Sequence, residues 1–424
     1  MPGYVDHRAL YRLPWNLADN PIAWLEPTQA CNLACDGCYR QNVKDHKSME
    51  VVQDELDTFA RLRNFDGVSI AGGDPLTHPQ VVEIVRRVAA MGRKPIINTN
   101  GLALTEEMLR DLKAAGLIGL TFHVDSKQGR PSWRDKTEKQ TNDLRQYFVD
   151  MVDRVGDLAV AFNSTVYEDT LEQVPDVLEW GEKNLGKVHT LVFIVYRAAK
   201  LEQFDYFANG KKIDMGELVY TIDAPRKTDL TSRDVVDSIR KRFPDFEPCS
   251  YLNGTEKPDS LKWLVSLRFG QAGKVYGYAG PKFMETTQSL YHLFAGRYLS
   301  YAPASTLSMG RSVFATSSLF DGGVRQAAAR FVRTALTNPL VLAKDVHVQT
   351  TAIIQPIDVL EDGRQNMCDG CPDMTIWDGR LAWSCRLEEN RNFGTNVYAT
   401  PKTKHLPVAA PKGLAADGRP DDAS

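Results

Sequence analysis

The sequence predicts an α/β protein: a partial (β/α)6 barrel of parallel strands with a C-terminal metal-binding extension. From about residue 22 to 196, short apolar runs rich in β-branched residues alternate with longer stretches of helical periodicity. This alternation is typical of repeated βα units and a parallel sheet. The seven cysteines cluster near residues 31–38 and 368–385, with Cys249 alone between them. Clustering of this kind favours metal ligation over disulfides.

Six segments are expected to be the barrel strands, because each is an apolar run bounded by turn or helix-start residues. Two of the intervening helices are well marked: one covers Met49–Arg63, and the other covers Glu106–Ala115 after an N-cap candidate at Thr105. Ligands of such sheets bind at the carboxyl ends of the strands. The expected strands are Ile22–Glu26, Gly67–Ala71, Lys94–Asn98, Ile118–Val124, Leu158–Val166 and Val188–Tyr196.

Length and composition indicate one large domain with a smaller appended one, because 424 residues exceed one ordinary domain. The net charge of −3 gives no electrostatic reason to expect nucleic-acid binding. The sequence shows neither a secretion signal nor a membrane-spanning run, so a cytoplasmic protein is expected. The expected division is an N-terminal extension at 1–20, a core domain at 21–200, a mixed region at 201–345, a cysteine-containing domain at 346–398 and a disordered tail at 399–424.

Three cysteines in the loop after the first strand are spaced to hold one metal cluster. Cys31, Cys35 and Cys38 are separated by three residues and then by two. A short loop can therefore wrap three thiolates around a four-iron cubane and leave one iron without a protein ligand. An open metal position can bind a substrate or a cofactor. The alternatives for these residues are a structural zinc site and redox-active cysteines.

This spacing resembles the Cys-x-x-x-Cys-x-x-Cys motif of the radical S-adenosylmethionine (SAM) superfamily, and the resemblance covers roughly residues 22–200. It implies that a [4Fe-4S] cluster binds SAM at the open iron. It further implies that one electron, from a donor such as flavodoxin or ferredoxin, cleaves SAM to a 5′-deoxyadenosyl radical that abstracts a substrate hydrogen. Members usually carry an aromatic residue before the third cysteine, whereas this chain has Gly37 there and Tyr39 directly after the cysteine. Tyr39 is therefore the candidate for this cofactor contact.

Other strand ends carry residues that resemble the SAM-binding positions of the superfamily. After the second strand, a Gly-Gly-Asp segment resembles the family's Gly-Gly-Glu, in which a carboxylate accepts from the SAM ammonium. An ordinary turn, a strand-end cap and a core histidine are the alternatives for these positions. The candidate cofactor residues are Gly72, Gly73, Asp74, Asn98 or Thr99, His123 and Asn163, and the candidate catalytic residues are His123 and Asp125.

A second metal site is predicted near the C-terminus. Cys368 and Cys371 precede an expected hairpin around Asp378-Gly379 that returns Cys385 to them, and Cys249 completes a possible set of four. Four thiolates suit a fully ligated [4Fe-4S] cluster or a zinc ion. The layout resembles the auxiliary-cluster modules of the superfamily called SPASM and twitch. An auxiliary cluster, zinc and the absence of a metal all remain open.

The substrate is not identified by any motif. The aromatic segment 276–301 can line an apolar cavity, dock onto a membrane or form core, and the helix expected around 324–336 is amphipathic and basic. We expect an apolar or lipid-like small molecule as substrate, with an ordinary surface favoured over a membrane surface for that helix. Peptide modification is the alternative within the enzyme class, and a non-catalytic iron-sulfur or zinc scaffold is the alternative outside it.

Overall fold

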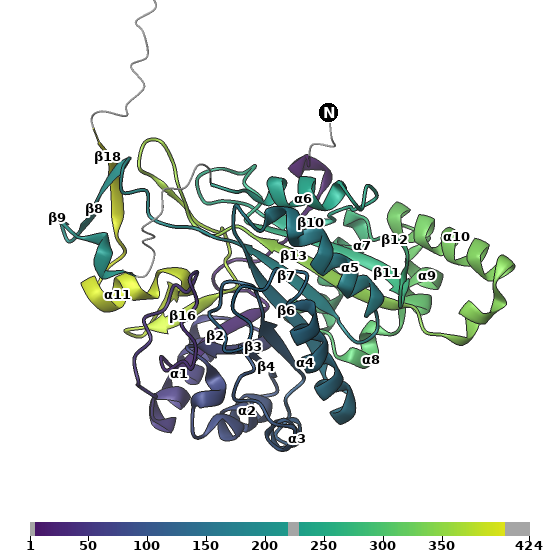
Figure 1. The fold of residues 1–424 in the computed structure, drawn as a ribbon, viewed down its shortest axis with the longest axis horizontal. Coiled ribbons are helices and arrows are strands. Elements are labelled where there is room, and N and C mark those ends of the chain that lie inside the picture. Colours follow the sequence, from purple (N-terminus) through teal and green to yellow (C-terminus); the bar gives the residue numbers. More distant parts are fainter. Residues whose placement is uncertain (1–4, 219–228, 403–424) are drawn as a thin grey trace, which may run out of the picture.

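The computed structural model describes residues 5–218 and 229–402, and its centre is a half-barrel of parallel strands (Figure 1). Neighbouring strands follow the order of the sequence, and every pair from β2 to β7 is parallel. The predicted fold class is therefore confirmed for the core. The six strands are β2 (Ile22–Thr28), β3 (Gly67–Gly72), β4 (Lys94–Thr99), β5 (Gly119–His123), β6 (Ala159–Val166) and β7 (Thr190–Val195).

Five helices connect these strands and cover the outer face of the sheet (Figure 1). Both helices that the sequence marked are confirmed: Ser48 caps the first, and the Thr105 side chain accepts from the amide of Met108 at the start of the second. In the first helix Val52, Leu56 and Phe59 are buried, whereas Val51 is exposed. The helices are α1 (Met49–Leu62), α2 (Val81–Ala90), α3 (Glu106–Ala114), α4 (Asn142–Val155) and α5 (Val174–Lys183).

The two faces of the half-barrel differ in how completely they are covered. Outward side chains such as Phe162 and Phe193 are buried in the main core under the helices. Inward side chains on the same strands, including Asn163, Val192 and Ile194, are only partly buried. Because side chains of a strand alternate between its faces, the inner face is left available for a ligand.

The sheet does not end at the sixth barrel strand. β13 (His347–Ile354) pairs in parallel with β7, and β11 (Trp263–Gln271) pairs antiparallel with β13. The expected boundaries at 200 and 345 therefore do not divide this sheet, and β1, from the expected N-terminal extension, also joins it. Local sequence patterns cannot show which distant strands share an edge. The remaining strands of this sheet are β1 (Tyr11–Arg12), β10 (Ser250–Leu252) and β12 (Lys274–Tyr278).

Smaller elements complete the described chain. The first residues of the expected disordered tail form β18 (Tyr398–Pro401), paired with β8 (Phe204–Ala208), and residues 403–424 lie outside the described part. In the described ranges, no helix combines the length and apolar character needed to cross a bilayer. The other elements are β9 (Lys211–Lys212), α6 (Ser232–Arg240), α7 (Pro281–Ala295), α8 (Ala304–Leu307), α9 (Gly310–Ser317), α10 (Gly322–Thr337), β14 (Asp358–Val359), β15 (Gln365–Asn366), β16 (Met374–Trp377), β17 (Arg380–Trp383), α11 (Leu387–Phe393) and the short 3-10 helices η1 (His7–Ala9), η2 (Pro75–Thr77), η3 (Leu171–Gln173), η4 (Met215–Glu217), η5 (Pro339–Ala343) and η6 (Ser384–Arg386).

The aromatic segment 276–301 is anchored to the barrel by Asp66, which directly precedes β3. The Asp66 carboxylate accepts from the Tyr291 hydroxyl at 2.9 Å and from the Ser300 amide at 3.0 Å, and it pairs with Lys94 at 2.7 Å. The Tyr301 hydroxyl bonds to Ser69 on β3. The tyrosines of this segment therefore pack against the barrel through polar contacts. Of the three roles considered for the segment, which were lining a cavity, docking onto a membrane and forming core, this corresponds to the third.

A histidine at the start of β7 makes stability depend on pH. Burial and the nearby His347 lower the pKa of His189 to about 4, and its Nδ1 accepts from the Val160 amide at 3.0 Å. The folded state thus favours the neutral ring, so this stabilisation is present above the unfolded pKa near 6.5 and is lost as pH falls toward 4. Between pH 7.5 and pH 5 we expect the free energy of unfolding of the parent, measured in urea, to fall by about 2 kcal/mol more than that of His189→Asn. Asparagine keeps an acceptor for the Val160 amide. Equal pH dependence in both proteins would contradict this assignment.

Candidate metal and cofactor site

The three N-terminal cysteines lie together in the loop that follows β2. Cys31, Cys35 and Cys38 line one cavity of about 320 Å³. The Asn100 side chain donates to Cys31 Sγ at 3.7 Å, and the Arg40 amide donates to Cys38 Sγ at 3.4 Å. Burial raises the pKa of all three thiols, and the neighbouring thiols add to the shift of Cys35. Thiols in such a setting become thiolates only when a cation takes the place of their protons.

The spacing of these thiols bears on which metal group fits. In the described residues, no three His, Cys, Asp or Glu side chains converge closely enough to hold a single ion. A zinc ion binds thiolates at about 2.3 Å, so its ligands must nearly touch one another. In a cubane each thiolate binds a different iron, so the sulfurs stand farther apart.

The two glycines at the end of β3 are required by the cysteine loop. A Cβ atom at Gly72 would collide with the Thr28 carbonyl oxygen, and one at Gly73 would collide with that of Ala30. Gly72 also has a φ of +105°, which favours glycine. The amides of Gly73 and Asp74 donate to those same two carbonyls, each at 2.8 Å. The segment thus holds the cysteine loop against the sheet by direct backbone contact.

Asp74 is engaged with protein donors. Its carboxylate accepts from the Asn100 amide at 2.8 Å, from the Leu76 amide at 3.0 Å and from the Thr99 hydroxyl at 2.9 Å. Burial, only partly opposed by these bonds, raises the pKa of Asp74. Asp74 and Thr99 therefore join the ends of β3 and β4, and their contact with a cofactor stays a prediction.

Two asparagines on the inner face carry polar atoms without partners. Asn98 Nδ2 on β4 and Asn163 Oδ1 on β6 are buried and make no hydrogen bond within the described residues. An unsatisfied buried polar atom costs about 1–3 kcal/mol. Of the pair Asn98 and Thr99, the structure thus leaves Asn98 available to a ligand. One donor and one acceptor facing the inner side of the barrel suit a polar cofactor such as SAM, so these residues fit that group.

His123 and Asp125 form a pair at the end of β5. His123 Nε2 lies 2.9 Å from Asp125 Oδ2 and 3.1 Å from the Thr165 hydroxyl. Burial alone would raise the pKa of Asp125, but the bond to His123 and the amides of Lys127 and Thr165 hold it below its usual value. Asp125 is therefore an anion, and His123 donates to it through Nε2.

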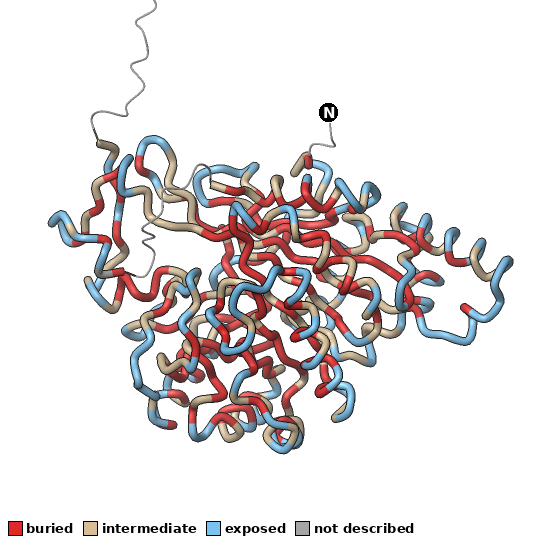
Figure 2. The backbone as a smooth tube through the Cα atoms, viewed as in Figure 1, coloured by how far each residue is buried: buried red, intermediate tan, exposed pale blue. Residues whose placement is uncertain are grey.

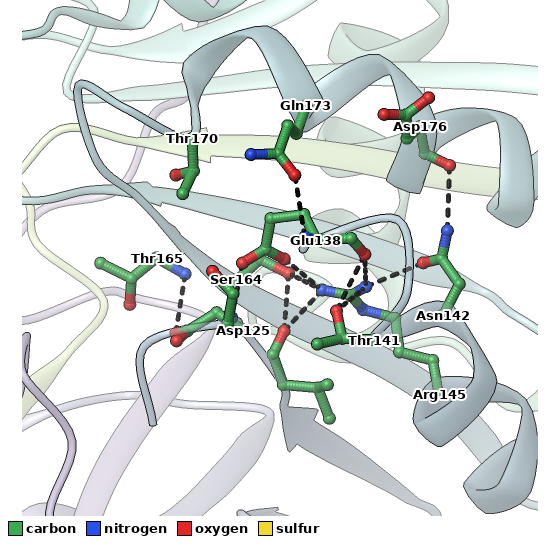
Figure 3. A network of polar contacts seen from close by, with 12 residues as sticks. Asp125, Glu138, Thr141, Asn142, Arg145, Ser164, Thr165, Thr170, Gln173 and Asp176 are labelled. Carbon is green, nitrogen blue, oxygen red and sulfur yellow. Dashed lines mark hydrogen bonds and ion pairs between the residues drawn. The ribbon is translucent and has the colours of Figure 1, made fainter. Parts of the chain in front are cut away.

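A buried network fixes the chain that follows this pair (Figure 3). Arg145 on α4 is fully buried and donates to Glu138 Oε2 at 2.9 Å, to the Val124 carbonyl at 2.6 Å and to the Ser164 hydroxyl at 2.9 Å. Glu138 Oε1 accepts from the Ser126 amide at 2.6 Å. The network thus holds both neighbours of Asp125 in place. The sequence contained no spacing signal for it, because its members come from the loop between β5 and α4, from α4 and from β6.

Arg130 is a buried residue near the cysteine loop that sequence reasoning missed. Its guanidinium donates to Gln128 at 2.7 Å, to the His123 carbonyl at 3.0 Å and to the Asn100 carbonyl. Burial lowers the pKa of Arg130, while Cys35 and Asp125 nearby oppose that shift. A buried cation beside the cysteine loop offsets the negative charge that thiolates and a cluster bring.

The chain departs from the family pattern at Gly37 and Tyr39, and both residues have defined neighbours in the structure. Burial raises the pKa of Tyr39, and the acidic groups that contribute to this shift include Asp373 and Cys385 of the C-terminal site. A Cβ at Gly37 would collide with the Tyr167 hydroxyl from the end of β6. An aromatic ring therefore does lie beside position 37, but a distant residue supplies it. The cofactor contact of Tyr39 stays a prediction.

The C-terminal cysteines form a set of three. The hairpin of β16 and β17 turns at Asp378 and Gly379, both with positive φ, as the sequence predicted. Cys368 and Cys371 share a hydrogen bond that lowers the pKa of the first and raises that of the second. Burial, and then the nearby Cys368, raise the pKa of Cys385 to about 12. The Cys368 and Cys371 thiols thus contact each other, and Cys385 lies near enough to interact electrostatically with Cys368.

Cys249 does not join this set. It is fully buried in a separate apolar core with Leu13 and Leu252, and its Sγ donates to the Val265 carbonyl at 3.4 Å. This is the environment of a small hydrophobic residue. The distance in sequence between Cys249 and the other cysteines did not reveal this environment, because the pairing of β10 with β11 decides where Cys249 lies.

Buried ion pairs connect the two cysteine loops. Glu26 on β2 pairs with Arg40, which lies two residues after Cys38. Glu26 Oε2 also lies 3.9 Å from Arg391 on α11. Arg391 also pairs with Glu388 at 2.6 Å. Glu26 is 1% exposed, and the arginine charges hold its pKa below the usual value although burial opposes them. These contacts fix the helix after Cys385 against the first cysteine loop.

Comparison with known proteins identifies the domain. The model of the radical SAM superfamily matches residues 25–181. An AdoMet-dependent heme synthase of Methanosarcina barkeri is 30% identical over 195 residues, which are 43% of this chain and 53% of that protein. A PqqA peptide cyclase of Xanthomonas campestris is 27% identical over 180 residues, 39% of this chain and 46% of the cyclase. The chain spans about half the length of these two relatives.

A solved structure gives a weaker likeness. Streptococcus suis SuiB bound to precursor peptide SuiA shows 16% identity and a TM-score of 0.34 over 42% of this chain and 40% of that one. The assignment therefore depends on the match over residues 25–181 and on the cysteine loop and parallel half-barrel found within it. Residues 25–181 of the chain are thus assigned to the radical SAM superfamily by this match.

Proposed function

We propose that the chain is an enzyme that reductively cleaves SAM at a [4Fe-4S] cluster held by Cys31, Cys35 and Cys38. The observation that carries this proposal is that the three thiols line one cavity at the carboxyl edge of a parallel half-barrel. When bound, the cluster supplies the electron that cleaves SAM to methionine and a 5′-deoxyadenosyl radical, which abstracts a hydrogen from the substrate. We propose flavodoxin or ferredoxin as the electron donor and the cytoplasm as the location.

The chain's own residues then position the cofactor. Asn98 on β4 and Asn163 on β6, with β5 between them, offer SAM an unpaired donor and an unpaired acceptor on the inner face. Arg130 supplies a buried positive charge beside the cysteines. The Asp125 carboxylate fixes the ring of His123, whose side chain is 36% exposed at the barrel mouth. We propose His123 as a residue that contacts cofactor or substrate, with Asp125 orienting it.

The proposed substrate is an apolar small molecule. Trp24, Val192 and Ile194 lie on the inner face, are only partly buried, and in the described chain belong to none of the packed apolar cores. Apolar side chains with a few polar atoms among them are the usual lining of a small-molecule site. The aromatic segment 276–301 gives this proposal no support, because its tyrosines are anchored at Asp66 and Ser69.

A peptide substrate is the second candidate. Its support is the convergence of Cys368, Cys371 and Cys385 and the similarity to a protein named PqqA peptide cyclase. The two candidates differ in what stimulates 5′-deoxyadenosine formation. A solvent extract of lipids from the host cell should raise the rate if the substrate is apolar, and a cell peptide fraction should raise it if the substrate is a peptide.

The proposal is tested by incubating anaerobically reconstituted protein with SAM and dithionite and measuring 5′-deoxyadenosine. Formation of this product above the level seen with iron-free protein supports the enzyme. A protein that binds iron but forms no 5′-deoxyadenosine would instead be a non-catalytic scaffold. The Asn163→Ala variant should keep its iron and bind SAM about tenfold more weakly, measured by equilibrium dialysis, because a buried hydrogen bond of about 1.5 kcal/mol is lost.

We also propose a second [4Fe-4S] cluster at the C-terminal cysteines. Replacing Cys368 and Cys371 together by Ala should reduce bound iron and sulfide to about half, since each cluster accounts for four irons. Cys249→Ala is the matched control and should keep the full amount, because its thiol lies in an apolar core. Unchanged iron in the double variant, with one zinc lost per chain, would favour a zinc site instead.

A further inference from the structure

Exposed apolar side chains are concentrated in the insertion between β12 and β13. In the described chain seventeen large apolar side chains are exposed, and ten of them lie between residues 290 and 342. Isolated exposed leucines are ordinary, whereas a concentration of them marks an interaction site. The five most exposed, at 73–84%, all belong to this insertion: Leu293, Phe294, Leu319, Leu336 and Leu340.

Residues 309–344 form a packed lobe at one end of the molecule (Figure 1), which we call the cationic lobe. It comprises α9, α10 and η5, and its interior contains Phe314, Val324 and Phe331. Exposed positions cover its outer side (Figure 2). Val332 and Leu336 lie one turn apart on α10 and are 55% and 80% exposed. The lobe is therefore folded, and its exposed side chains are not a loosened core.

The lobe carries a strong positive charge. Its cationic side chains are Arg311, Arg325, Arg330, Arg333 and Lys344, while the chain as a whole has a net charge of −3. Its one acidic residue, Asp321, is buried, caps α10 through the Val324 amide and accepts from the Gly280 amide. Two of the five cations are paired with acidic residues outside the lobe, Arg311 with Asp345 at 3.0 Å and Arg330 with Asp245 at 2.9 Å. In the described ranges, neither Arg333 nor Lys344 has an acidic partner within salt-bridge distance. The solvent-facing side of the lobe is thus apolar and cationic together.

We propose that the cationic lobe docks the protein onto an anionic lipid bilayer. Protruding leucines among arginines can enter the headgroup region while the cations remain beside the lipid phosphates. Each Lys or Arg near an anionic membrane adds about 1 kcal/mol of attraction. A second copy of the chain is a poorer fit, because the lobe protrudes from one end of the molecule and a paired interface needs a self-complementary surface (Figure 1).

The docking surface is separate from the proposed reaction site. The lobe is attached through β12, which pairs with β11, whereas the cysteine loop follows β2 at the opposite end of the sheet order. A variant that no longer binds membranes should therefore still cleave SAM, and a variant that no longer cleaves SAM should still bind membranes. A failure of this inference is in that way distinguishable from a failure of the proposed function.

The test is sedimentation of the full-length, iron-reconstituted protein with vesicles. We expect binding to vesicles of phosphatidylcholine with phosphatidylglycerol and little binding to phosphatidylcholine alone. Binding should weaken as ionic strength rises from about 0.1 M to about 0.5 M, because salt screens the attraction. Equal binding to both kinds of vesicle, or binding to neither, overturns the proposal.

Paired substitutions locate the surface. The double variant Arg333→Gln with Lys344→Gln should weaken vesicle binding about 25-fold, because each cation contributes about 1 kcal/mol of attraction. The double variant Leu336→Ser with Leu340→Ser should weaken vesicle binding at least about tenfold, because it removes apolar side chains from the docking surface. The matched controls, Lys211→Gln with Lys257→Gln and Leu102→Ser with Leu201→Ser, change exposed residues elsewhere and should bind like the parent.

Two outcomes of these substitutions count against the proposal. Both lobe variants binding like the parent would overturn it. So would a dimer, seen by sedimentation equilibrium, that forms without vesicle binding and dissociates on Leu336→Ser with Leu340→Ser, because the lobe would then be an interface between copies.

Discussion

Replacing Cys35 by Ala is expected to abolish 5′-deoxyadenosine formation and the visible absorption of the first cluster. Three thiolates are the whole set of protein ligands expected for this cubane, so no other side chain of the loop can compensate for a lost one. Cys31→Ala and Cys38→Ala should behave alike, because all three thiols line the same cavity. The measurement is iron and sulfide content together with the product assay, under anaerobic conditions.

Cys249→Ala is the matched control for this series. It removes a buried thiol of the same chain from an apolar core and should leave iron content and product formation unchanged. Thermal unfolding followed by circular dichroism separates a lost ligand from a lost fold. Retention of SAM cleavage in any one of the three loop variants would remove the basis for the proposed function.

Glu138→Gln is expected to lower the free energy of unfolding by about 3–5 kcal/mol, because it leaves the guanidinium of Arg145 buried without its counter-charge. The two side chains are 0% and 5% exposed, so water cannot replace the lost carboxylate. Replacing both partners, as Arg145→Met with Glu138→Leu, should recover much of that loss, since a buried pair and an apolar substitute are often similar in stability. Urea unfolding of the parent and these two variants gives the comparison.

An exposed pair provides the control for the buried one. Glu106→Gln breaks the ion pair between Glu106 and Arg154, whose side chains are 32% and 53% exposed, and should cost much less stability than Glu138→Gln. A loss of similar size for Glu138→Gln would show that Arg145 finds other compensation. The network also flanks Asp125 (Figure 3), so in folded Glu138→Gln we expect slower SAM cleavage with unchanged iron.

Local pattern carried the sequence analysis furthest where the fold is built from repeats. Each barrel strand carries apolar side chains on the face that packs under the helices. The six strands were therefore readable as short apolar runs, and Thr105 was readable as a cap because it directly precedes a helical pattern. The pattern failed at β13, which the sequence placed in a separate cysteine-containing domain, because a strand's own residues do not record which edge it joins.

The candidate site divides in the same way. The cysteine loop was predictable, since its three ligands lie within eight residues of one another. Arg130 and the ring of Tyr167 were not, because their place beside that loop depends on the ends of other strands. Cys249 shows the reverse error: counting cysteines suggested a ligand, and the pairing of β10 with β11 places it in an apolar core.

The sequence by itself determined the ligand loop, the order of the barrel strands and the positions of their carboxyl ends, because periodicity and short-range spacing are properties of neighbouring residues. Only the tertiary structure decided which polar atoms stay unpaired, where the second set of thiols converges, and that the basic helix belongs to an exposed apolar lobe. The burial of a side chain and its hydrogen-bond partners depend on residues that are far apart in the chain, and these residues meet only in the folded protein.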